Sequence, residues 1–69
     1  MAAYLKHNDK QLYLKSIDKD NDKLEFTESV SEAKPYDNDW FAKAELEFLQ
    51  FHYPDYKEEY LNHLVPWYE

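Results

Sequence analysis

The run Asp18-Lys19-Asp20-Asn21-Asp22 comes closest to a binding motif in this chain. Carboxylates at alternate positions begin an EF-hand loop, because their oxygen atoms converge on Ca²⁺. The rest of such a loop is missing, since Lys23 stands where glycine is needed and Ser29 where a bidentate glutamate is needed. Asn and Asp also favour tight turns. We therefore expect an exposed hairpin turn at this run and no metal site.

The remaining polar residues offer no recognisable catalytic set. His7, His52 and His63 are never four residues apart, and there is no cysteine to complete a zinc site. A site built from His52, His63 and a distant acid is the alternative. Glycine is absent, which excludes the phosphate-binding loops and the nucleophile elbow that depend on it. No serine or carboxylate pair stands in a catalytic context. We expect no enzyme activity and no cofactor.

The aromatic residues near the C-terminus are the strongest functional candidates. Tyr and Trp are enriched at interface hot spots because they are large, rigid and amphipathic. We predict partner binding through Tyr53, Tyr56, Trp67 and Tyr68, and we assign Phe51, Tyr60 and Leu64 mainly to the core. Trp67 and Tyr68 follow Pro66. They either fold back and pack on the domain itself or contact a partner.

The charge balance restricts the partners. The chain has fifteen acidic residues and eight lysines, which gives a net charge of −7. This surface repels phosphate and anionic lipid, so we expect no direct nucleic acid binding and no membrane binding. No apolar run approaches the length of a membrane span, and the expected location is cytoplasmic. The alternative function is a nucleic-acid-mimicking inhibitor that uses an acidic surface: Asp18, Asp20, Asp22, Glu25, Glu28 and Glu32.

The first half of the chain predicts strands. The chain has 69 residues, 13 of them aromatic, which is enough for one small folded domain over residues 1–69. Alternating apolar and polar residues predict strands at 3–7, 11–17 and 23–27, joined as an antiparallel meander. The predicted inner face holds Leu5, Leu12, Leu14, Leu24 and Phe26. The predicted outer face holds Tyr4, Lys6, Tyr13, Lys15 and Glu25.

The second half predicts helices. One turn is expected over 30–34, and a helix over 39–52 is capped by Asn38 or Asp39. This helix has a wide apolar arc, expected to cover the sheet, and a smaller one. Another helix is expected over 54–64, ended by Pro66. The fold class is α+β, a three-stranded antiparallel β-meander followed by two α-helices on one face. The wide arc comprises Trp40, Phe41, Ala44, Phe48 and Phe51, and the smaller arc comprises Ala42, Leu46 and Leu49.

The smaller apolar arc of the helix over 39–52 must be buried against some other surface. The second helix would supply it in a monomer, which we favour, and a second copy of the chain would supply it in a homodimer. If the wide arc is core, Phe48→Ala should cost roughly 3–5 kcal/mol.

The string from Leu24 to Tyr36, LEFTESVSEAKPY, resembles the strand-then-"SEAK" segment of small phage and prophage proteins of low-GC Gram-positive bacteria. The resemblance implies a stand-alone accessory protein that acts by binding, and it implies no functional residues. The function expected from the sequence is a non-enzymatic, small, acidic protein–protein interaction module of this phage-like kind.

Overall fold

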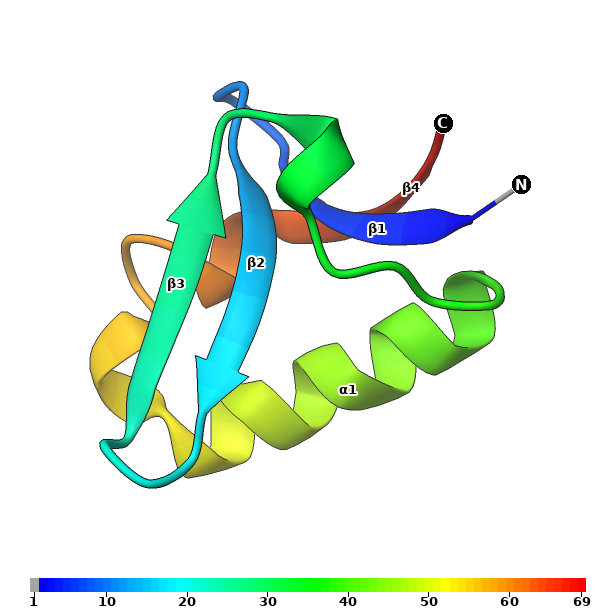
Figure 1. Cartoon of the computed structure of the whole chain (residues 1–69). Helices are drawn as coiled ribbons and strands as arrows, with labels where there is room; N and C mark the ends of the chain where they lie inside the picture. The colour runs from blue at the N-terminus through cyan, green and yellow to red at the C-terminus, as the bar shows by residue number, and fades with distance from the viewer. Residues whose placement is uncertain (1) are drawn as a thin grey trace.

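The computed structural model describes residues 2–69 as a four-stranded antiparallel sheet with one long helix packed on one face (Figure 1). The strands are β1 (Ala3–His7), β2 (Tyr13–Asp18), β3 (Lys23–Thr27) and β4 (Leu64–Tyr68), in the order β3-β2-β1-β4. The helix α1 (Asp39–His52) connects the meander to β4. Short 3-10 turns occupy Val30–Glu32, Pro54–Tyr56 and Leu61–His63. The α+β class is confirmed.

The meander forms where the alternation predicts it. β1 and β3 have the expected bounds, and β2 begins two residues later than expected. Without glycine, the β2–β3 turn uses Asp22, whose φ of 53° is left-handed. Asp tolerates this conformation because its short polar side chain can bond locally.

A β-bulge in β2 changes the predicted inner face. Leu14 pairs with Phe26 and Ser16 pairs with Glu25, so Lys15 is the extra residue. The bulge reverses the alternation and brings Ile17, opposite Leu24, to the inner face. Ile17 packs against the core cluster, whereas Leu12 lies before β2 and outside that cluster.

One residue of the predicted outer face, Tyr13, is buried. Tyr13 pairs with Lys6 on this face, yet only 1% of its surface is exposed. Its ring packs edge-on against Tyr4, and its hydroxyl donates to Glu69 Oε2 at 2.5 Å. This hydrogen bond, together with burial, raises the pKa of Tyr13. The contact ties the C-terminus of the chain to the sheet.

The predicted second helix is wrong. Residues 54–63 form two 3-10 turns, and the chain then enters β4, which pairs along the whole of β1. The sequence around Pro66 is β-favouring, with Val65, Trp67 and Tyr68. A proline is tolerated because β4 is an edge strand. This segment becomes a strand because it pairs with the otherwise unpaired edge of β1. The hydrophobic periodicity of the sequence does not reveal that edge.

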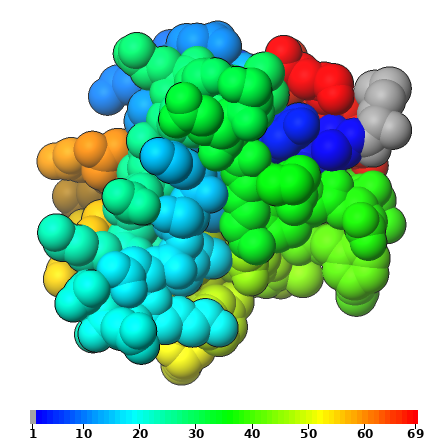
Figure 2. Space-filling model, viewed as in Figure 1, coloured from blue at the N-terminus to red at the C-terminus, as the bar shows by residue number. Residues whose placement is uncertain are grey.

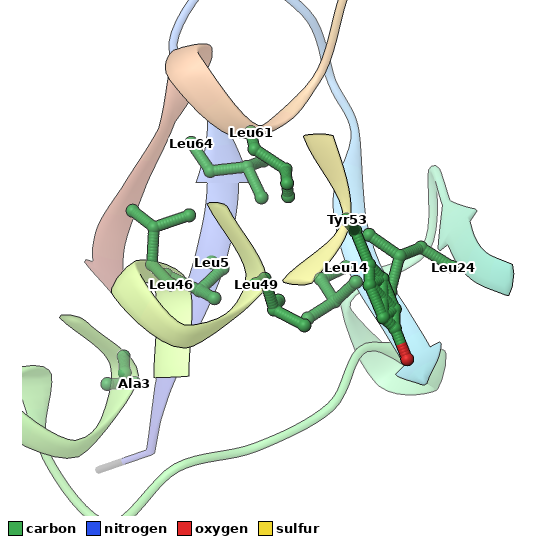
Figure 3. Close-up of a cluster of buried hydrophobic side chains, with 10 residues drawn as sticks. Ala3, Leu5, Leu14, Leu24, Leu46, Leu49, Tyr53, Leu61 and Leu64 are labelled. Carbon is green, nitrogen blue, oxygen red and sulfur yellow. The ribbon is translucent and has the colours of Figure 1, made fainter. Parts of the chain in front are cut away.

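The core lies between the sheet and the smaller arc of α1, and it is drawn in Figure 3. Leu46 and Leu49 project from the helix onto Leu5 and Leu14 of the sheet. The prediction that the wide arc packs on the sheet is therefore wrong. The buried cluster consists of Ala3, Leu5, Leu14, Leu24, Ala42, Leu46, Leu49, Tyr53, Leu61 and Leu64.

Candidate interaction surface

The side of α1 that faces away from the core carries four large, exposed apolar side chains, among them the two most exposed in the described chain. Trp40 is 69% exposed and Phe51 is 80% exposed, while Phe41 and Phe48 are each nearly half exposed. At 100° per residue these positions share one side of the helix with Ala44. We call this surface the aromatic face; its residues are Trp40, Phe41, Ala44, Phe48 and Phe51.

One polar contact caps α1, and two others join it to the rest of the domain. The Asn38 side chain accepts a hydrogen bond from the Phe41 N–H at 3.0 Å and so caps the helix. The Tyr68 hydroxyl accepts from the Asp39 N–H at 2.8 Å, which joins the first turn to β4. The Tyr36 hydroxyl donates to Glu45 at 2.7 Å on the opposite side of the helix. Because the contacts to Tyr68 and Tyr36 lie on two flanks of α1, they fix how the helix is turned and hence which way the aromatic face points.

The rings of the aromatic face contact one another and their neighbours. Trp40 and Phe41 meet edge to face with centroids 5.2 Å apart. His52 packs against both Phe48, at 4.2 Å, and Phe51, at 5.0 Å. Beside Ala44 lies a shallow hollow of about 280 Å³, which is lined by Trp40, Lys43, Ala44 and Glu47. The surface is therefore apolar, ridged and rimmed by single charges of both signs.

The predicted partner-binding residues do not form one surface. Tyr53 is 8% exposed and belongs to the core, where burial and the nearby Asp22 and Asp18 raise its pKa. Tyr56 is half-buried and packs against the same core. Trp67 and Tyr68 are exposed, but as neighbours in a strand they point to opposite faces of the sheet.

Trp67 and Tyr68 consequently have different surroundings. Trp67 pairs with Tyr4 on the outer face, and the Lys6 ammonium lies 4.9 Å from the Trp67 ring centroid. Tyr68 reaches the first turn of α1 through Asp39, close to the aromatic face. Of the two, only Tyr68 forms a hydrogen bond with α1.

The acids of the alternative function lie mainly around β3 and its two connections. Asp18 accepts hydrogen bonds from Asn21, and these bonds hold the pKa of its carboxyl below the ordinary value. Glu25 accepts from the Ser16 hydroxyl at 2.7 Å, and Glu32 pairs with Lys15 at 3.7 Å. The remaining three acids, Asp20, Asp22 and Glu28, are exposed.

Another hollow, of about 520 Å³, lies between β2 and the segment that leads into α1. Figure 2 shows this side of the molecule, where the blue-cyan residues of β2 meet the green residues that follow β3. Lys15 and Lys34 line it, and each forms an ion pair, with Glu32 and Glu45 respectively. Ser16 also lines it, and the Ser16 hydroxyl donates a hydrogen bond to Glu25.

The histidines pair in an arrangement that the sequence did not suggest. The His7 ring is buried and stacks on His63, with centroids 4.9 Å apart. His7 Nδ1 accepts from the Asp9 N–H at 3.0 Å, and His63 Nε2 donates to the Glu58 carbonyl at 3.0 Å. Within residues 2–69, no three histidine or carboxylate side chains gather as a metal site would require.

Comparison with protein-family models finds no match to this chain, and comparisons with curated proteins and with solved structures find none either. The resemblance to small phage proteins therefore stays a prediction. No helix within residues 2–69 has both the length and the apolar character needed to cross a membrane.

Proposed function

We propose that this protein is a non-enzymatic interaction module that binds protein through the aromatic face of α1. The observation that carries the proposal is the exposure of Trp40, Phe41, Phe48 and Phe51 together on one side of a single capped helix. Trp and Phe are enriched in the buried centres of protein interfaces.

The fold does not need these rings. Ala42, Leu46 and Leu49, on the other side of α1, fill the space against the sheet. Exposed aromatic surface is costly in a chain of this size, where little apolar area is available to the core. A contiguous patch of this kind on a soluble domain marks an interaction site.

The rim of the aromatic face suits a specific protein contact. Lys43, Glu47 and Glu45 flank the rings and remain at the surface or half-buried. Polar groups around an apolar centre set the orientation of a partner, while the centre supplies most of the affinity.

Site-specific photo-crosslinking in cells tests the proposal. A photoreactive amino acid is placed at Phe51 and, as a matched control, at Trp67, which is exposed on the outer face of the sheet. We expect discrete crosslinked proteins from position 51 that disappear when Ala44→Glu is added. No product at position 51, or the same products at position 67, would refute the proposal.

A further inference from the structure

We infer that the occupant of the aromatic face is a second copy of this chain, bound through an antiparallel pair of α1 helices. This inference rests on the proposed function, because it names the partner of the same surface. Three observations support it: the spacing of the rings, the self-complementarity of the face and the area that it exposes.

The spacing of the apolar residues is that of a helix–helix seam. Phe41, Ala44, Phe48 and Phe51 follow one another at intervals of three, four and three residues. This is the a/d pattern with which two helices pack side by side. Ala42 and Leu49 lie on the opposite side of the helix, in the chain's own core, so the seam is free.

The seam is complementary to itself when two copies run antiparallel. Phe41 then faces the partner's Phe51, and Ala44 faces the partner's Phe48. A small residue opposite a large one lets the backbones approach, and the hollow beside Ala44 receives the ring. Since both copies use the same surface, the contact closes as a two-fold dimer.

The exposed area matches a small dimer interface. A fully buried aromatic side chain covers about 150–250 Å². With 43–80% of each ring exposed, the four aromatic residues present on the order of 500 Å² of surface. Two copies that covered all of this surface, Trp40 included, would bury at most about 1,000 Å² in total, which is near the lower bound for a specific interface.

Sedimentation equilibrium at two salt concentrations tests the dimer. We expect twice the chain mass at high micromolar concentration, and tighter association in about 500 mM than in about 50 mM NaCl, because salt screens the repulsion between two acidic copies. Ala44→Glu should raise the dissociation constant roughly 30-fold or more, while Trp67→Ala should leave it unchanged. A folded wild type that keeps the mass of one chain throughout would overturn the inference.

Mixed cysteine variants test the antiparallel register. The chain has no cysteine, so Phe41→Cys and Phe51→Cys introduce single thiols. The two variants should form a disulfide-linked dimer when mixed. Neither should do so alone, because equivalent positions would lie about 15 Å apart along the helices. Equal crosslinking of Phe41→Cys with itself would overturn the antiparallel pairing.

The absence of a homodimer and the absence of an interaction surface would give different results. A monomer that still crosslinks from position 51 to a different protein would refute the second copy and keep the interaction surface. If that different protein is basic, its binding should weaken as salt rises, which is opposite to the behaviour expected of the dimer.

Discussion

The two sides of α1 contrast in residue size and burial. Ala42, Leu46 and Leu49 are buried, while the bulkier Trp40 and Phe51 are exposed on the other side of the same helix. Ala42, which is 0% exposed, has no side chain beyond Cβ, so the helix can approach the sheet closely. The contrast shows that shape and close approach, and not hydrophobic area alone, decide which arc becomes core.

The largest expected effect comes from truncating the buried side. Leu49→Ala should lower the free energy of unfolding by about 2–5 kcal/mol, because it removes a fully buried side chain and leaves a cavity. Phe51→Ala, on the exposed side, is the matched control and should leave the monomer nearly unchanged. Thermal unfolding at low micromolar concentration measures both. Equal losses in the two variants would contradict the assignment of the core.

Two alanines of α1 give a sharper version of the same comparison. Ala42→Leu overfills the contact with the sheet and should cost about 1–3 kcal/mol. Ala44→Leu makes the same chemical change on the exposed side, where there is space. Chemical denaturation of the two variants should therefore separate them. The comparison fails if Ala44→Leu destabilises the monomer as much as Ala42→Leu does.

The Asn38 cap stabilises the first turn of α1, which carries residues of both the buried and the exposed side. Asn38→Ala removes the acceptor for the Phe41 N–H and should cost about 1 kcal/mol. Asn38→Asp retains an acceptor and should behave as the wild type. Melting temperatures check the stability, and amide exchange of residues 40–42 checks that the loss is local to the first turn. Unchanged exchange in Asn38→Ala would show that the cap does not hold this end of the helix.

The smallest effect concerns the border between the two sides, where Tyr36 meets Glu45. Burial, followed by the hydrogen bond to Glu45, raises the pKa of Tyr36 above the ordinary tyrosine value. Folding favours the neutral Tyr36 hydroxyl. The stability that this hydroxyl contributes to the folded state is therefore fully present below about pH 10. It is lost as the pH rises through the higher pKa of the folded state.

Tyr36→Phe measures this contribution. The variant should cost about 0.5–1.5 kcal/mol at neutral pH, because it removes the bond to Glu45. Between about pH 9 and about pH 11 it should lose less stability than the wild type, since one raised tyrosine is absent. Parallel pH-dependent melting curves for the two proteins would contradict the role of Tyr36.

Local sequence signals determined the regular elements of the meander and the helix. Alternation defined β1 and β3, and Asn38 with the apolar periodicity defined α1 from Asp39 to His52. The use of Asp in a left-handed turn position without glycine is confirmed at Asp22, between β2 and β3. These features depend on neighbours in the chain, whose preferences are written in a few adjacent residues.

Only the tertiary structure decided the features that depend on distant residues. The bulge at Lys15 selected Ile17 for the inner face, and the free edge of β1 drew residues 64–68 into β4. The wheel of α1 showed two apolar arcs but not which one would meet the sheet. That choice depends on the shape of a surface assembled from four strands, so it left the aromatic face exposed where periodicity alone had placed it in the core.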